Sequence, residues 1–332
     1  MSQDRIRLAV PAARALAERA LAGIGYDAEE SRIIADHVLD AALCGYEYSG
    51  LAKILNIPET PRFAAPRRKM TVLRETEVST LYDGGNNIGM LSLHHAAREA
   101  VAKAAVRGFA LIGLTNSWMS GRSAHFVEMI AKADLIAIHT ASATRAVAPF
   151  GGTRPALGTN PIAFALPTSR GPVVFDMGTA AFMMTELMLR ERKGESLPQG
   201  VALDAAGAPT TDPASARQGA LLPFGGHSGG HKGFGLALMV HAFGVLTGSA
   251  LDLDGDNGYL FIVFKPDLLT PLDQFKREMS ELIDRVKATP RQQGVDEIRI
   301  PSEHAFRHRE RALRKGIEID RTVYEALEKL AG

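Results

Sequence analysis

Patterns typical of helices lie at both ends of this chain, and patterns typical of strands lie between them. Apolar residues at helical spacing predict two helices within the first 45 residues. Asp27, followed by Glu30 three residues later, predicts a capping box at the start of the second helix. Residues 271–288 and 302–331 also have helical patterns. This order predicts a mixed α and β fold in which the two termini meet and close a helical domain.

A domain boundary is predicted at residues 58–69, which contain three prolines and four basic residues. We therefore expect residues 1–70 and 300–332 to form the helical domain. Residues 71–299 are expected to form an αβ domain that binds cofactor and substrate. Within that domain a long glycine- and proline-rich stretch leads into an apolar helix predicted at residues 236–248.

Composition excludes several classes of protein. The 332 residues include 38 Lys and Arg against 37 Asp and Glu, so electrostatics gives no reason to expect a nucleic acid or an anionic membrane as partner. Cys44 is the single cysteine, which excludes an intrachain disulfide and a cysteine zinc site. No uncharged apolar run is long enough to span a membrane, and the start lacks a secretory signal pattern. We expect a cytoplasmic enzyme.

The glycine-rich segments do not match the common nucleotide-binding motifs. The spacing G-x-G-x-x-G fails at residues 83–89 and 225–235, and the P-loop pattern fails because Lys232 lies between His231 and Gly233. An ordinary Rossmann or P-loop fold is therefore not predicted. The segment 225–235 is interpreted as a loop before a helix, which binds phosphate through backbone N–H groups or is simply a tight loop with a surface lysine.

Two pairs of histidines have the i, i+4 spacing of metal ligands. The pair His227 and His231 lies in the glycine-rich segment, and the pair His304 and His308 lies among arginines that disfavour a dication. Neither pair has a third ligand at a suggestive spacing. No metal site is predicted.

Several longer motifs occur in a consistent order from about residue 11 to residue 330. On these motifs the chain resembles the type 2 malate/L-lactate dehydrogenase family, also called sulfolactate dehydrogenase-like, which includes ureidoglycolate dehydrogenase and the piperideine- and pyrroline-2-carboxylate reductases. The motifs are DGGNNIG (83–89), APFGG (148–152), LGTNPIAFALP (157–167), FDMGT (175–179), GAPTTDP (207–213), GALLPFGG (219–226), HKGFGLALMV (231–240) and RALRKGIEID (311–320).

The resemblance implies a non-Rossmann fold with a helical terminal domain and an αβ cofactor-binding domain. It further implies a homodimeric oxidoreductase that uses NAD or NADP. The reaction would transfer a hydride between nicotinamide and a small 2-oxo acid or cyclic 2-imino acid. The residues that the resemblance assigns to the cofactor are Thr159, Asn160, Pro161, Asp176, Met177, Gly178, Lys232, Ser302, Glu303 and His304.

The chain departs from the family pattern mainly where proton transfer and substrate binding are expected. The family's Ser-His pair corresponds to Tyr48 and Ser49, and the arginine that would hold a substrate carboxylate corresponds to Lys53. These three residues are the predicted catalytic group. A second family histidine corresponds to Met119. The predicted substrate pocket consists of Met119, Thr144, Arg145 and His231.

These departures bear on the substrate. Reduction of a ketone leaves an alkoxide that needs a positioned acid, whereas a protonated imine becomes a neutral amine without one. These departures therefore favour an imino acid over a 2-oxo acid as the expected substrate. Tyr48, with an unperturbed pKa near 10, Ser49 and two histidines are the candidate proton carriers, and Lys53 or Arg145 would pair with a substrate carboxylate. A nucleotide-binding relative without activity is the alternative.

The form of the cofactor is left open by the sequence. Arg307 and Arg309 would suit the 2′-phosphate of NADP, whereas Glu303 would suit the ribose hydroxyls of NAD.

Overall fold

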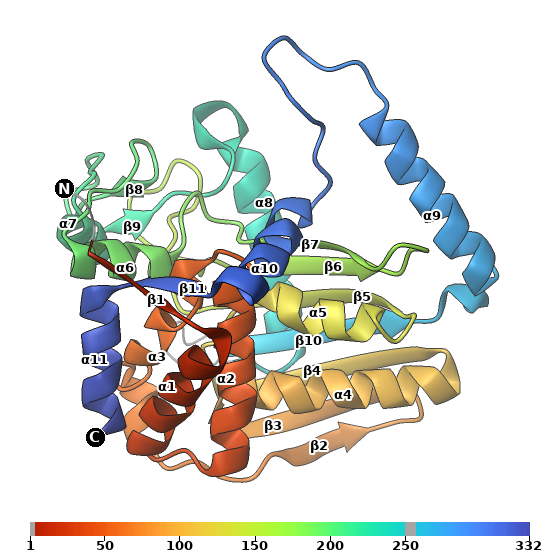
Figure 1. The fold of residues 1–332 in the computed structure, drawn as a ribbon, viewed down its shortest axis with the longest axis horizontal. Coiled ribbons are helices and arrows are strands. Elements are labelled where there is room, and N and C mark those ends of the chain that lie inside the picture. Colours follow the sequence, from red (N-terminus) through yellow and green to blue (C-terminus); the bar gives the residue numbers. More distant parts are fainter. Residues whose placement is uncertain (1–3, 250–256) are drawn as a thin grey trace.

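The fold is built around a mixed β-sheet, seen in a computed structural model that describes residues 4–249 and 257–332 (Figure 1). In the described residues the sheet has seven strands in the order β2-β3-β4-β10-β5-β6-β7. Neighbouring strands are antiparallel except for β3 and β4, which are parallel and joined through helix α4. The strands are β2 (Thr71–Glu75), β3 (Ser79–Ile88), β4 (Phe109–Trp118), β5 (Ile136–Ala141), β6 (Ile162–Leu166), β7 (Val173–Met177) and β10 (Asn257–Phe264).

The two faces of this sheet are covered unequally. Helices α4 (Gly89–Arg107) and α5 (Ser123–Ala131) pack on one face against alternate residues such as Ile112 and Leu114. Gly113 points the opposite way, and a Cβ there would lie 3.1 Å from a methyl group of Thr247, just beyond helix α8 (Gly226–Leu246). Helix α8 therefore crosses the second face, which it covers only in part.

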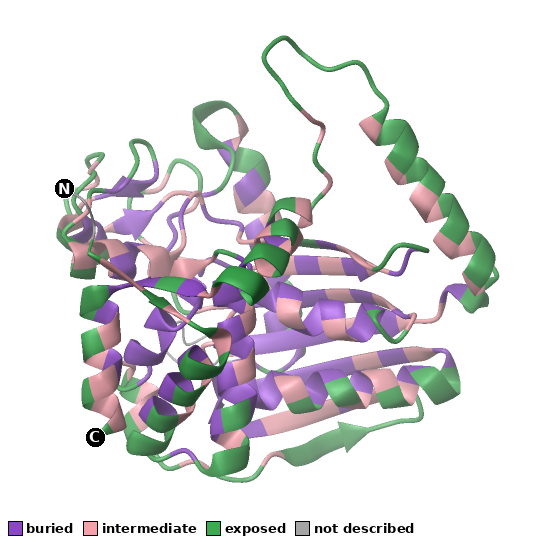
Figure 2. Cartoon of the chain, viewed as in Figure 1, coloured by how far each residue is buried: buried purple, intermediate pink, exposed green. Residues whose placement is uncertain are grey.

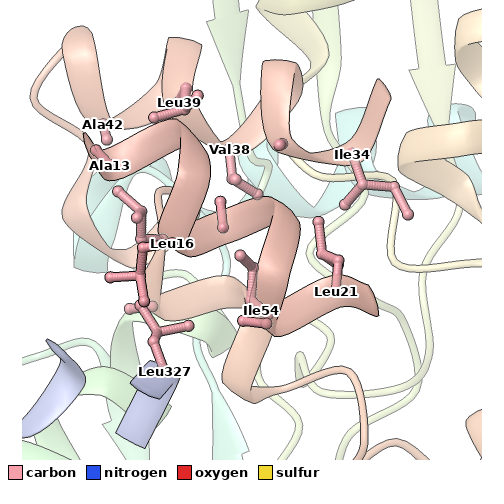
Figure 3. Close-up of a cluster of buried hydrophobic side chains, with 14 of the residues drawn as sticks. Ala13, Leu16, Leu21, Ile34, Val38, Leu39, Ala42, Ile54 and Leu327 are labelled. Atoms are coloured by element: carbon pink, nitrogen blue, oxygen red, sulfur yellow. The ribbon is translucent and has the colours of Figure 1, made fainter. Parts of the chain in front are cut away.

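The helices of both termini share one apolar core (Figure 3). Leu16, Leu21, Ile34, Ile54 and Leu327 are all nearly or completely buried in it. The helical domain of residues 1–70 and 300–332 stays a prediction, because the same core also includes Ile88, Met90, Leu91, Trp118 and Leu189. Its elements are β1 (Arg5–Leu8), α1 (Val10–Gly23), α2 (Ala28–Leu43), η1 (Glu47–Ser49), α3 (Ala52–Leu55), η2 (Pro61–Ala64), α10 (Glu303–Lys315), β11 (Ile317–Asp320) and α11 (Arg321–Ala331).

Two further parts complete the described chain. A small layer beside the terminal helices, above β1 and α11 in Figure 1, has its own apolar cluster and contains α6 (Met184–Lys193), β8 (Ala202–Leu203), α7 (Pro213–Gln218) and β9 (Ala220–Leu221). After β10 the chain forms η3 (Pro266–Leu268) and then α9 (Leu272–Lys287), which extends from the body and has no buried residue (Figure 2).

Most local predictions agree with these elements, and the capping box of Asp27 and Glu30 is present with both of its hydrogen bonds. Two predictions are wrong. The segment 302–331 is not a continuous helix, because Gly316 (φ +88°) ends α10 and strand β11 follows and pairs with β1. The segment 225–235 is not a loop, because α8 begins at Gly226.

The glycines of that segment serve close packing inside a helix. A Cβ on Gly233 would lie 2.0 Å from the carbonyl oxygen of Phe224, and a Cβ on Gly230 would lie 2.7 Å from the ring of Phe150. Glycine permits this close approach, and the sequence pattern does not separate that use from its use in loops.

Candidate active site

A cavity of about 500 Å³ lies where η1, the start of α5, the end of β7 and the segment before α10 meet. It brings together residues that are more than 250 positions apart in the sequence, from Tyr46 to Ser302. The predicted site residues that line it are Tyr48, Ser49, Pro161, Asp176, Met177, Gly178 and Ser302. Three lining residues that the sequence analysis missed are Tyr46, Arg122 and Arg299.

Asp176, at the end of β7, joins the sheet to helix α5. Its Oδ2 accepts a hydrogen bond of 2.7 Å from the backbone N–H of Ala124 in the first turn of α5, where a carboxylate is favoured by the helix dipole. Burial raises the pKa of Asp176, while backbone hydrogen bonds from Ala124 and Ser123 and the charge of Arg122 oppose that rise. The Asp176 side chain thus fixes the start of α5 at the cavity wall.

Arg122, two residues before Ala124, also lines the cavity and is held by charge. Its guanidinium donates a 2.7 Å hydrogen bond to Asp40 of α2 and lies 5.0 Å from the ring centroid of Tyr46. Asp40 also accepts a 2.9 Å hydrogen bond from Arg309 of α10. Burial opposes ionisation of Asp40, but a hydrogen bond with His125 and the arginine charges lower its pKa below the usual range. Asp40 therefore stays ionised and ties both terminal helices to the cavity.

Gly121 and His37 set the position of that wall. The Nε2 of His37 accepts a 2.8 Å hydrogen bond from the backbone N–H of Arg122. Burial, with the nearby His125, lowers the pKa of His37 well below its ordinary value, so its ring is a neutral acceptor. Gly121 has φ +79°, and a Cβ there would lie 2.1 Å from the same Nε2.

Substitution Gly121→Ala is expected to destabilise the protein by about 2 kcal/mol or more, because it combines a left-handed backbone with a steric conflict at His37. The control is Gly25→Ala, where φ is +95° and no atom lies within 4 Å of the added Cβ. That variant should lose only about 1 kcal/mol. Urea unfolding measures both, and equal losses would contradict the steric role of His37.

Tyr48 and Lys53 differ in how they approach the cavity. Tyr48 lines it, and burial, followed by the nearby carboxylates of Glu186 and Asp176, raises its pKa above the usual range. Lys53 is only 5 % exposed and does not line the cavity, although Ser49, four residues earlier, does. Burial lowers the pKa of Lys53 to about 8. The positive charge of Lys53 helps to lower the pKa of His37. Among the described residues, the side chain of Lys53 has no hydrogen-bond or ion-pair partner.

Other predicted residues lie outside the cavity lining. Asn160 is fully buried and uses its amide within the protein, because Oδ1 accepts from Ala143 N–H and Nδ2 donates to the Ala237 carbonyl. Thr159 accepts hydrogen bonds from Thr179 through its carbonyl. The roles predicted for the remaining residues stay predictions: Met119, which packs on the terminal core; Thr144, Arg145, His231, Lys232 and His304, which are exposed; and Glu303, which pairs with Lys287.

Within residues 4–249 and 257–332, no group of three or more His, Cys, Asp or Glu side chains is arranged to hold a metal ion. In the same residues, no helix combines the length and the apolar character needed to cross a membrane.

Comparisons with known proteins agree with this architecture. The profile of the family described as Malate/L-lactate dehydrogenase matches residues 8–328. An L-sulfolactate dehydrogenase of Methanothermobacter thermautotrophicus is 34 % identical over 90 % of this chain and 89 % of its own length. A Delta(1)-pyrroline-2-carboxylate/Delta(1)-piperideine-2-carboxylate reductase of Pseudomonas putida is 35 % identical over 71 % of each chain. The structure of a malate dehydrogenase from Pyrococcus horikoshii superposes with a TM-score of 0.87, at 29 % identity over 100 % of this chain and 97 % of that one.

The chain belongs to the malate/L-lactate dehydrogenase family. It is an oxidoreductase of the class that acts on hydroxy and oxo acids or on imino acids, and membership of a dehydrogenase family implies a nicotinamide cofactor.

Proposed function

We propose that this protein is an NAD(P)-dependent reductase of small 2-imino carboxylates, with 2-oxo acids as weaker substrates. The observation that carries this choice is the lining of the cavity. Among the described residues it contains hydroxyl groups, one carboxylate and two arginines, but no imidazole. Asp176 is the one acidic side chain of the described lining, and in its ionised form it attracts a cationic iminium carbon and repels an alkoxide.

The lining residues fit an elongated cofactor. Ile300 and Pro301 line both this cavity and a second one of about 330 Å³, so the two cavities adjoin along one wall. Gly178 also lines the first cavity, where a Cβ would lie 2.5 Å from the sulfur of Met183, so its absence leaves room. We propose that Pro161, Asp176, Met177 and Gly178 hold the nicotinamide end.

In the proposed reaction, the bound nicotinamide supplies the hydride to the imine carbon. Asp176 holds the start of α5 and stabilises the positive charge of the substrate. Lys53 contributes a positive potential behind Ser49, which attracts the substrate carboxylate. Tyr48 keeps its proton at all working pH values and donates a hydrogen bond to the oxyanion that forms when the substrate is a 2-oxo acid.

The test is a panel of cyclic 2-imino acids and 2-oxo acids with NADH and NADPH, followed by loss of nicotinamide absorbance. Faster reduction of the imino acids supports the proposal, and faster reduction of the oxo acids contradicts the choice of substrate. Nucleotide binding without turnover on any member of the panel would instead favour an inactive nucleotide-binding relative.

We also propose a homodimer, with α8 at its interface. A helix that is apolar on all sides is normally buried, and a large exposed apolar patch marks an interface. On α8 the residues Leu238, Met239, Phe243, Val245 and Leu246 are between 38 % and 64 % exposed. They lie over the sheet face that α4 and α5 leave open, and a second copy of the chain would cover them. The near-neutral charge and the composition support small-molecule partners and a cytoplasmic location.

Leu246→Asp is therefore expected to convert the dimer to a monomer, because the interface would have to bury an unpaired carboxylate. Val106→Asp is the matched control, since Val106 is 78 % exposed on α4, which covers the other face. Size-exclusion chromatography with light scattering measures the mass of each. A dimer that survives Leu246→Asp would exclude α8 from the interface.

A further inference from the structure

A third cavity, of about 440 Å³, lies between the ends of α2 and α10, the start of α3 and the paired strands β1 and β11. We call this space the terminal cavity. Its volume is within the range of about 300–1,000 Å³ that is typical of pockets for small ligands. Among the described residues, none that lines it also lines the active-site cavity, although η1 borders both: Glu47 lines the terminal cavity, whereas Tyr48 and Ser49 line the other.

The buried part of the lining is apolar. Leu51, Ala312 and Val323 line the terminal cavity and are each at most 3 % exposed. The arginine and lysine side chains of the lining are more exposed than these three. A pocket with an apolar base and a few charged groups suits a ligand that has an apolar body and a charged head.

The two carboxylates of the lining are each paired with an arginine. Nη1 of Arg5 donates hydrogen bonds of 3.2 and 3.1 Å to the two oxygens of Glu47. Nε of Arg7 donates one of 3.0 Å to Glu318. The charges within each pair cancel, so any further cation in the lining gives the terminal cavity a net positive charge.

Helix α10 supplies two further cations, Arg311 and Lys315, which lie one turn apart on the same face and both line the terminal cavity. In the described part of the chain, neither side chain has a hydrogen-bond or ion-pair partner. Like charges at this spacing repel each other. The carboxyl ends of α2 and α10 each contribute about half a negative charge, so together they offset about one of the two cations. An anion in the terminal cavity would neutralise the remainder.

The wall between α2 and α10 is fixed by His308. Its Nδ1 donates a 2.7 Å hydrogen bond to the carbonyl oxygen of Leu43, one of the carbonyl groups that the end of α2 leaves free. Gly45 has φ +87°, and a Cβ there would lie 3.2 Å from the His308 ring. Both residues line the terminal cavity, which is therefore bounded by a fixed junction of the two helices.

We propose that the terminal cavity is a binding site for a small organic anion. Its carboxylate or phosphate head pairs with Arg311 and Lys315, and its apolar body lies against Leu51 and Val323. A guanidinium group binds either kind of head through two parallel hydrogen bonds, and the ammonium group adds a point charge. This inference goes beyond the proposed function, because the site is separate from the cavity proposed for nicotinamide and substrate.

Isothermal titration calorimetry on the whole protein tests the site with pentanoate and butyl phosphate, which carry the two kinds of head on similar apolar tails. Pentanol is the uncharged control. We expect at least one of the anions to bind, and the one that binds more tightly identifies the kind of head. Pentanol should not bind measurably, and added chloride should weaken binding of the anion, because salt screens charges that are exposed to solvent.

Substitutions Arg311→Gln and Lys315→Gln should each weaken binding of the anion by about tenfold, because each removes one charged partner of its head. Arg314→Gln is the matched control. Arg314 is an exposed residue in the same last turn of α10, so it meets the same helix dipole, but it does not line the terminal cavity. Its substitution should leave the affinity unchanged. Urea unfolding should show that neither Arg311→Gln nor Lys315→Gln destabilises the protein more than Arg314→Gln does.

Three outcomes would overturn the inference: neither anion binds, Arg311→Gln and Lys315→Gln bind as tightly as the wild type, or all three variants weaken binding equally. Binding should also persist when NADH or NADPH is present in excess. Displacement of the anion by a nucleotide would place it in the active-site cavity and would also overturn the inference. None of these results bears on the reductase proposal, which the substrate panel tests.

Discussion

Replacing Lys53 with methionine is expected to make the protein more stable and a much weaker catalyst. At neutral pH the buried ammonium is protonated in both the folded and the unfolded chain, and the folded chain bears its desolvation. The fall of its pKa from 10.5 to about 8 corresponds to roughly 3 kcal/mol, which methionine would recover. We propose that this unpaired cation acts through its electrostatic potential on a bound anionic ligand. We therefore expect kcat/KM for an anionic substrate to fall by about 10²-fold.

The pH dependence of the free energy of unfolding distinguishes removal of a buried charge from improved packing as the cause of the added stability. Between about pH 8 and 10.5 the unfolded chain binds the proton of Lys53 more strongly than the folded chain does. The wild type therefore regains, as pH rises through this interval, the stability that burial of the charged Lys53 costs. The stability advantage of Lys53→Met should be largest below pH 8 and shrink above it. The activity of the wild type should fall above about pH 8, because deprotonation of Lys53 removes the charge that attracts the substrate carboxylate.

Two variants make the test specific. Lys53→Arg should restore part of the lost activity, because it restores a cation at the same position. Lys103→Met is the control, since Lys103 is a mostly buried lysine of α4 that is paired with Glu75 at 3.0 Å. It should bring neither a gain in stability nor a loss of activity. A Lys53→Met variant that is less stable than the wild type and fully active would refute this role for Lys53.

Much of the fold could be predicted from local patterns, because those patterns report on neighbouring residues. The capping box of Asp27 and Glu30 is an example in which four neighbouring residues determine the start of a helix. The helix of residues 226–235 could not be predicted, because glycine there allows contact with Phe224 and Phe150, which a local pattern does not show. Family resemblance assigns several segments to the cofactor, and residues from some of them line the cavity, while their role stays a prediction.

The rest of the site depends on pairings between distant residues. Arg122 is 82 positions from Asp40, and its backbone N–H is held by His37, 85 positions away. No spacing rule connects such residues, so the sequence analysis did not single out Arg122 or His37. The burial of individual side chains could not be predicted from the sequence either. Lys53 was identified by its alignment with a family arginine, whereas its lack of a partner and its lowered pKa follow from packing alone.

Packing also changes the interpretation of Tyr48. An unperturbed phenol was a candidate proton carrier, but burial and the carboxylates of Glu186 and Asp176 raise its pKa further from neutrality. A group of this kind remains protonated and acts as a hydrogen-bond donor. A donor of this type matters most when negative charge develops on the substrate. Its contribution should therefore depend on whether the reacting group is a ketone or an imine.

Substitution Tyr48→Phe is expected to lower kcat for a 2-oxo acid by about 10²-fold, because the developing oxyanion loses its donor in a cavity that also contains Asp176. KM should change little. For a cyclic imino acid the same variant should lose less than threefold, since the protonated imine becomes a neutral amine and no oxyanion forms. Steady-state kinetics on both substrates measures the two ratios, and neither should show a titration near the histidine pKa of about 6.5.

Tyr46→Phe is the matched control, because Tyr46 also lines the cavity and its ring lies 6.2 Å from that of Tyr48 in an edge-to-face contact. Its ring interacts with Arg122, and phenylalanine preserves that contact, so both activities should persist. Equal losses on ketone and imine in Tyr48→Phe would mean that the hydroxyl positions the substrate and does not stabilise charge. No loss on either substrate would make Tyr48 a wall of the cavity, and the oxyanion of any ketone substrate would then need a donor from another lining residue.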